Sequence, residues 1–120
     1  MGINFAQAVA VHGDALQLRT ERTRILAANI ANENTPGYQA QDMDFAAVMA
    51  SGQAAADGTP QLDGDNGPLY RVPYHPSADG NTVEIGVEQA AFAQNASDYQ
   101  TSLTFLSMDL KGIAKAIAGQ

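Results

Sequence analysis

An unbroken apolar seam in the last third of the chain limits what this sequence can fold into. Apolar residues recur there at alternating spacings of four and three, the heptad pattern of helices that pack by knobs into holes. We predict a helix over residues 83–120, with Gly119 at its C-terminal cap. The polar outer face is compatible with solvent or polar contacts: Gln94, Asp98, Ser102, Asp109 and Lys115. The seam consists of Phe92, Ala96, Tyr99, Leu103, Leu106, Leu110, Ile113 and Ile117.

A second helix is predicted near the N-terminus, from about Phe5 to Ala31. No proline interrupts this stretch. One stripe of residues at helical spacing is only partly apolar, and a second stripe beside it makes the apolar face broad. The predicted fold is mainly α, with long N- and C-terminal helices packed as an antiparallel coiled-coil pair. An irregular loop with at most a short β segment joins them. This divides the chain into an N-terminal helix (1–34), a turn and flexible connection (35–82) and a C-terminal helix (83–120).

The first helix is predicted to stop near Asn32, at the sequence Asn-Thr-Pro-Gly-Tyr. Thr35 precedes Pro36, and the proline ring pushes the preceding residue out of the helical region. Gly37 tolerates a positive φ, and short asparagine side chains bond to nearby backbone groups. We therefore interpret this segment as a helix stop followed by a turn.

The connection between the helices is predicted to be irregular. Residues 51–67 are rich in Gly, Ala and Asp, and such a segment buries too little apolar surface to offset its ordering entropy, so we predict a mobile loop. Residues 69–74 could form a short extended piece, which prolines confine to an edge. Residues 79–81 carry a turn signal.

The charge balance excludes several function classes. Thirteen acidic and six basic residues give a net charge of −7, which argues against nucleic acid and anionic lipid as partners. Without cysteine, the chain has no disulfide and no thiolate metal site. We see neither a Sec-type signal at the N-terminus nor an apolar run near the 20 or so residues that span a bilayer.

No catalytic, cofactor or metal site is predicted. His12 lies on a helix stripe and is interpreted as a half-buried packing residue, and His75 as a solvent-facing loop residue. The segment that starts at Asp63 resembles the beginning of a calcium loop but lacks its later ligands. Asp42 and Asp44 are interpreted as solvated carboxylates, and the Asn95 glycosylation sequon as a coincidence inside a helix.

Residues 28–38 closely resemble the N-terminal signature of bacterial flagellar axial proteins, the rod, hook and hook-associated subunits. Residues 39–45, 70–74, 79–92 and 95–106 are similar to the proximal-rod members of that family. Asn34, where the family often has Asp, and Met43, where Ile is common, are mild departures. The short loop is a larger one. The signature positions are Ala28, Asn29, Ala31, Asn32, Thr35, Pro36, Gly37 and Tyr38.

The resemblance implies a structural subunit of the basal-body rod, which polymerises through its terminal helices into part of a hollow drive shaft. It further implies export by the flagellar type III apparatus without a cleaved signal, and a periplasmic location. The implied partners are other rod subunits, the MS-ring, the rod-junction protein and the export gate. The expected assembly contacts are the seam, apart from Ala96, and the N-terminal positions Val9, Leu16, Leu26 and Ile30.

Three alternatives stay open at this point. A soluble helical-hairpin chaperone or regulator of a secretion system would explain the two helices, but not the turn with its asparagines. A different rod subunit of the same family is the nearest competitor. An enzyme using Asp42 and Asp44 as an acid/base pair would need a pocket that so small a chain is not expected to build.

Overall fold

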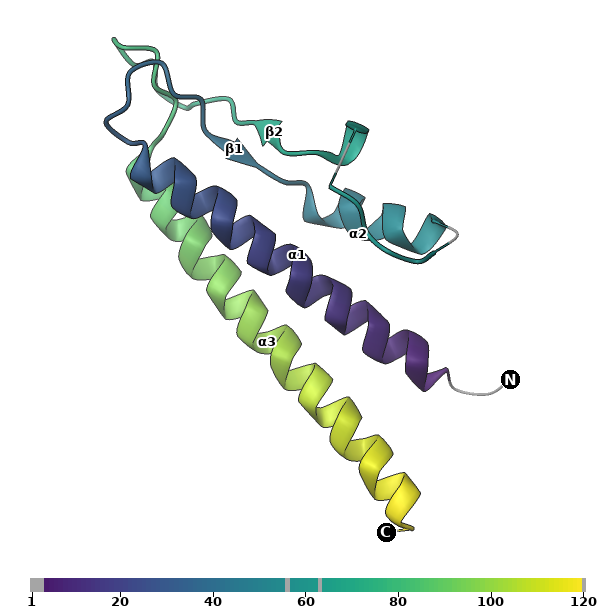
Figure 1. Ribbon diagram of the computed structural model, residues 1–120. Helices are drawn as coiled ribbons and strands as arrows, with labels where there is room; N and C mark the ends of the chain where they lie inside the picture. The colour runs from purple at the N-terminus through teal and green to yellow at the C-terminus, as the bar shows by residue number, and fades with distance from the viewer. Residues whose placement is uncertain (1–3, 56, 63, 120) are drawn as a thin grey trace.

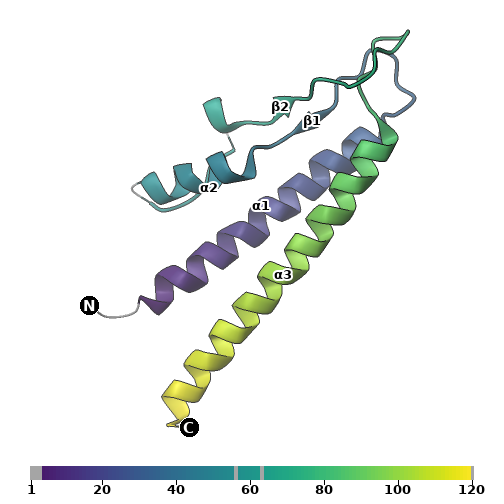
Figure 2. The ribbon, with the colours of Figure 1, turned by 180° about the vertical axis from the view of Figure 1, so that it is seen from behind.

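Two long helices form the body of the molecule in the computed structural model, which describes residues 4–55, 57–62 and 64–119. Helix α1 (Phe5–Ala31) and helix α3 (Ile85–Ala118) lie side by side and antiparallel (Figures 1 and 2). The molecule is elongated, with extents of 64 × 28 × 18 Å. The mainly helical pair and its short irregular middle confirm the predicted fold class.

The ends of both helices follow from local sequence. The side chain of Asn4 accepts a hydrogen bond from the Gln7 amide and caps α1. Gly119 ends α3 with a φ of 73°, so the predicted glycine cap is confirmed. Neither these helices nor any other helix in the described residues is long and apolar enough to cross a bilayer.

The connecting segment folds back along α1 (Figure 1). It contains strand β1 (Gln41–Asp42), helix α2 (Phe45–Ala54), a 3-10 turn (Gly64–Asn66) and strand β2 (Leu69–Tyr70). The two strands pair antiparallel, with Gln41 opposite Tyr70. The predicted short extended piece is confirmed at β2, while its partner β1 was not predicted.

Helix α2 departs from the predicted loop, because residues 51–54 form its last turn. Its N-terminus is capped by Asp44, whose side chain accepts a hydrogen bond from the Ala47 amide. Val48 is buried against α1, and Gly52 lies so close to Pro60 that a Cβ would come within 2.7 Å of the proline ring. Packing of this kind stabilises a short helix that its own composition would leave marginal.

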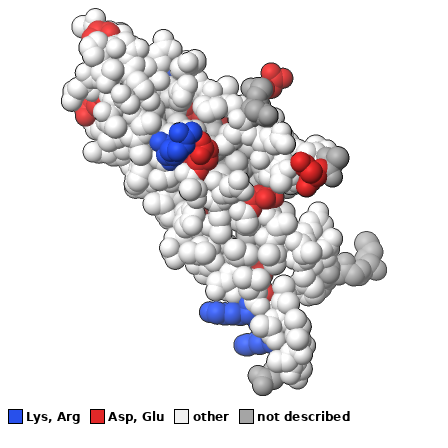
Figure 3. Space-filling model, in the orientation of Figure 1, with Lys and Arg blue, Asp and Glu red and all other residues white. Residues whose placement is uncertain are grey.

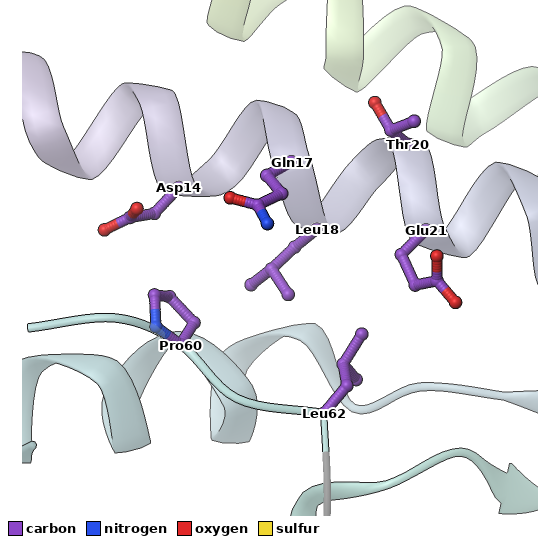
Figure 4. A pocket seen from close by; sticks show the side chains of 7 residues that line it. All are labelled: Asp14, Gln17, Leu18, Thr20, Glu21, Pro60 and Leu62. Atoms are coloured by element: carbon purple, nitrogen blue, oxygen red, sulfur yellow. The ribbon is translucent and has the colours of Figure 1, made fainter.

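The apolar core lies between α1 and the connecting segment, on the side of α1 away from α3. Buried residues from α1 meet Met43, which lies between β1 and α2, and a buried residue of α2 there, and Phe45, Met49 and Leu62 cover them. A hollow of about 400 Å³ also lies there, with Leu18 pointing toward Pro60 and Leu62 (Figure 4). The core residues are Leu18, Ile25, Met43 and Val48.

The α1–α3 contact is polar along much of its length, which corrects the predicted outer face of α3. Asp98 forms an ion pair with Arg19 at 3.3 Å, and Asp109 lies 3.6 Å from His12. Both aspartates therefore face α1. The polar positions recur every seven residues along α3, and we call them the polar stripe: Glu88, Asn95, Ser102 and Asp109.

Candidate functional site: the turn motif and the uncovered seam

The signature turn joins the end of α1 to the segment that precedes α3. Gly37 has a φ of 72°, a conformation that favours glycine, and its amide donates to the carbonyl of Asp79. The amide of Thr82 donates in turn to the carbonyl of Tyr38 at 2.9 Å. The predicted stop and turn are confirmed, and these bonds fix residues 37–40 against residues 79–82.

Asn81 closes the end of α1 from outside the helix. Its side-chain amide donates to the carbonyls of Asn32, Glu33 and Thr35 at 2.8–2.9 Å. These carbonyls belong to the turn that directly follows α1, and a single buried side-chain amide holds all three of them. The sequence predicts residues 79–81 only as a turn, because no local pattern indicates that Asn81 reaches 46 residues back to Thr35.

Asn29 is the buried member of the signature. Its side chain is fully buried and bonds the backbone of Gln41 in both directions, at 2.7 Å through its amide and 3.1 Å through its oxygen. Its amide also donates to Glu88 of α3 at 2.9 Å, and the Tyr38 hydroxyl donates to its oxygen. One asparagine therefore joins α1, β1 and α3, whereas Ala28, Ala31, Thr35 and Pro36 remain exposed.

A network of charged side chains surrounds Asn29. The fully buried carboxylate of Glu88 accepts a hydrogen bond from Arg71, which also donates to Asp42 at 2.8 Å. Arg22 donates to both oxygens of Asp42, at 2.8 and 2.9 Å. We call this set of residues the charge knot: Arg22, Asn29, Asp42, Arg71 and Glu88.

The environment of Asp42 shows how the charge knot keeps its charges. Burial raises the pKa of the Asp42 carboxyl, but hydrogen bonds from Arg22, the Met43 amide and Arg71 outweigh burial and hold that pKa below its ordinary value. The hydrogen bonds that Arg22 donates to Asp42 raise the pKa of Arg22. Asp42 is therefore an ion-pair partner at this site, which corrects its interpretation as a solvated acid.

Asn95 crosses between the helices about two turns of α3 after Glu88 of the charge knot. It is buried, and its amide donates to the Arg19 carbonyl at 2.9 Å and to the Thr23 hydroxyl at 2.8 Å. Its side-chain oxygen has no partner among the described residues. Because Asn95 is enclosed by α1, it is not accessible as a glycosylation acceptor in this fold. Buried polar side chains that bond across a helix pair, such as Asn95 and Asn29, favour one register of the two helices.

Two other predicted positions behave as expected. His12 is half-buried and stacks on Phe105, with ring centroids 5.9 Å apart. The His75 side chain is 87% exposed. No cluster of three His, Asp or Glu that could hold a metal occurs among the described residues, and Asp63 lies outside them.

The seam of α3 lies on one flank of the helix pair and is largely uncovered. Phe92, Leu103 and Leu110 are 37–50% exposed and Ile117 is 83% exposed. The seam therefore does not pack squarely against α1 as a coiled-coil seam would. The other positions expected to form assembly contacts are half-buried, namely Tyr99, Leu106, Ile113, Val9, Leu16 and Ile30.

Leu26 differs from the rest of that set. Its side chain has no exposed surface. It is therefore a core residue of the single chain and is not available to a neighbour. Helical spacing alone did not distinguish it from Leu16 or Ile30, because neighbouring positions of one broad stripe can face either α3 or the connecting segment.

Comparison with known proteins gives the same family from the whole chain and from the turn region. The family model described as flagella basal body rod protein matches residues 9–39. A relative from Cereibacter sphaeroides, named flagellar basal body rod protein FlgB, is 44% identical and aligns with 97% of this chain and 98% of its own length. Relatives of the same name from Salmonella typhimurium and Aeromonas hydrophila are 43% and 34% identical, over 88% and 100% of this chain and 89% and 99% of theirs.

Proposed function

The chain belongs to the flagellar basal body rod proteins, in the group whose relatives are named FlgB, and from this we propose that it polymerises through its terminal helices into part of a hollow drive shaft. The family is structural and not enzymatic, so the enzyme alternative is set aside. Membership places the chain in the basal body, among other rod and basal-body components. We further propose a periplasmic position in the rod, reached by type III export without a cleaved signal.

The observation that carries the proposal is the uncovered seam. A single subunit leaves Leu103, Leu110 and Ile117 exposed in one line along α3. Exposed apolar surface of this extent marks an interaction site in most proteins that do not span membranes. Stacking of copies or related subunits along their helices would cover it. A contact between unlike surfaces that does not close on itself produces a helical tube.

The specific partners are part of the proposal. Besides other rod subunits, we propose that the chain contacts the MS-ring, the rod-junction protein and the export gate. The signature turn is suited to a fixed structural role, because the charge knot and Asn81 hold it to both helices. A rigid turn end would keep the seam in one orientation along the tube.

The test replaces one seam residue in the flagellated parent organism. Leu110→Asp puts a charge on the seam, and we expect loss of rod assembly and of swimming while the subunit is still made. Thr101→Asp is the matched control, because nine residues are two and a half helical turns and place Thr101 on the opposite side of α3. Normal swimming of the Leu110→Asp strain would contradict the proposal.

A further inference from the structure

A second uncovered apolar surface lies at the other end of the molecule from the tail of α3. Residues 69–75, which we call the strap, include four large apolar side chains that point outward. Leu69 is 55% exposed, Tyr70 65%, Val72 85% and Tyr74 79%. The arginine between them, Arg71, points inward to Asp42 and Glu88. The usual arrangement, with apolar groups inside and charges outside, is therefore reversed along the strap.

The strap is held firmly in this arrangement. The amide of Arg71 donates to the Ala40 carbonyl at 2.8 Å, and its side chain enters the charge knot. The amides of Tyr74 and His75 both donate to the Glu84 carboxylate at 3.1 Å, beside the start of α3. Backbone and side-chain bonds thus fix the strap at three points, and its exposed side chains form a preorganised surface.

The strap is poorly suited to adding another β-strand. Proline has no amide hydrogen to donate, and Pro68 and Pro73 flank and interrupt the free edge. The strand itself is only two residues long. A partner would therefore contact the apolar side chains of the strap, and a helix with an apolar stripe has the matching shape and chemistry.

The seam of α3 is such a stripe, but it cannot reach the strap of its own chain. The strap is anchored at Glu84 and Glu88, and the tail seam begins at Leu103, fifteen residues further along a straight helix. That separation is roughly 22 Å at the standard helical rise. Both surfaces can therefore be covered only by a different molecule.

Charge decides which pairing between copies is favourable. The last ten residues carry Lys111 and Lys115 and no acid, whereas residues 32–82 carry seven acids against Arg71 alone. Figure 3 shows basic side chains projecting from the C-terminal end of α3 and acidic ones over the connecting segment. Tail against tail would bring lysines together, and strap against strap would bring acids together. Tail against strap pairs opposite charges.

We propose that the strap of one copy receives the C-terminal seam of α3 from a second copy, in a head-to-tail contact. The proposal rests on the proposed rod function and specifies which surfaces meet. Leu103, Leu110 and Ile117 of the tail contact Leu69, Tyr70, Val72 and Tyr74 of the strap. The two lysines face the acidic connecting segment at the rim of the contact.

Cysteine cross-linking of the full-length chain tests this contact without background, because the sequence contains no cysteine. A Val72→Cys variant is mixed with an Ala114→Cys variant at concentrations where sedimentation velocity shows self-association, and the mixture is oxidised. Ala114 lies among Leu103, Leu106, Leu110 and Lys111 on the seam. We expect the mixed disulfide dimer to exceed both like-with-like dimers several-fold, and to decrease as salt increases.

Gly112→Cys is the matched control for Ala114→Cys. Gly112 is exposed, has no atom within 4 Å of a Cβ built there, and lies about 200° around the helix from Ala114. It should cross-link poorly with Val72→Cys. Dominant tail-to-tail dimers, equal cross-linking by the control, or a chain that stays monomeric would each overturn the contact. So would a cross-link from Val72 to a different protein in isolated basal bodies. Swimming of the Leu110→Asp strain would instead contradict the proposed polymerisation through the seam.

Discussion

The two ends of the helix pair are built differently. At the turn end, where α1 stops and α3 starts, the charge knot, Asn81 and the β1–β2 ladder join three segments of the chain. At the terminal end, the described contacts between the helices include the stacking of His12 on Phe105 and the distance of 3.6 Å between the His12 ring and the Asp109 carboxylate. All the buried side chains that the structure describes on α3 precede residue 96. Contacts within the chain hold the two helices together at the turn end, whereas apolar side chains remain uncovered at the terminal end.

This difference separates folding from assembly. The turn end gains its stability from contacts within one chain, so we expect it to be folded in the monomer. The terminal end keeps exposed apolar side chains that a neighbour can cover. Regions with few buried contacts open at low cost in free energy. We therefore expect substitutions at the turn end to change the stability of the monomer, and substitutions at the terminal end to change assembly.

The largest expected effect comes from breaking the charge knot. Glu88→Ala removes the buried partner of Arg71 and Asn29, and we expect the free energy of unfolding to fall by about 3 kcal/mol. Urea denaturation followed by circular dichroism measures it. Asp109→Ala is the control, since Asp109 occupies the same stripe three heptads later and its side chain is 40% exposed. It should cost less than about 1 kcal/mol. Equal losses would remove the distinction between the two ends.

A smaller difference is expected between two leucines. Leu26→Ala opens a cavity at a site with no exposed surface, and should lower the free energy of unfolding by about 2–3 kcal/mol. Leu110→Ala shortens a side chain that is already 50% exposed, and it should change the free energy of unfolding by about 0.5 kcal/mol or less. Urea denaturation of both variants checks this, and sedimentation at high concentration should show impaired self-association only for Leu110→Ala. A stability loss of similar size at Leu110 would mean that the monomer already covers its seam.

The smallest expected effect is the acid sensitivity of the turn end. Because its folded-state pKa is lowered, the Asp42 carboxyl stabilises the fold above its unfolded pKa of about 3.9, and this contribution is lost as the pH falls through the folded pKa. Asp42→Asn should reduce stability near neutral pH and make the decrease below about pH 4 shallower. Denaturation midpoints at several pH values measure it. If the Asp42→Asn variant kept the pH profile of the parent chain, Asp42 would be excluded as a source of the acid sensitivity.

Hydrogen exchange can locate that loss. The Arg71 amide bonds to Ala40 beside the charge knot, so its protection should fall in acid in the parent chain. Amides in α3 beyond Asp109 should exchange readily at every pH in the monomer, because that end has little covering it. Strong protection there in dilute monomer would contradict the proposed contrast between the ends.

Much of the fold was determined by the sequence alone. Apolar periodicity predicts both long helices, and Pro36 and Gly37 predict the turn, because these signals depend on residues that are close together in the sequence. Helix α2 was missed because residues 45–54 have weak local signals and depend on packing of Val48 against α1. The resemblance in residues 28–38 identified the family, which the relatives confirm.

Only the tertiary structure decided which face of α3 meets α1. The heptad pattern located an apolar seam but not its partner, and the polar stripe faces α1 instead because Glu88 and Asn95 find hydrogen-bond partners there. In the sequence Asn29 is one position of a turn signature, yet its role depends on Glu88, 59 residues away. The spacing of apolar residues and the conformational preferences of turn residues are properties of neighbouring residues, and so they can be recognised directly in the sequence. The pairing of buried polar groups depends on which segments the fold brings together, and only the folded chain determines it.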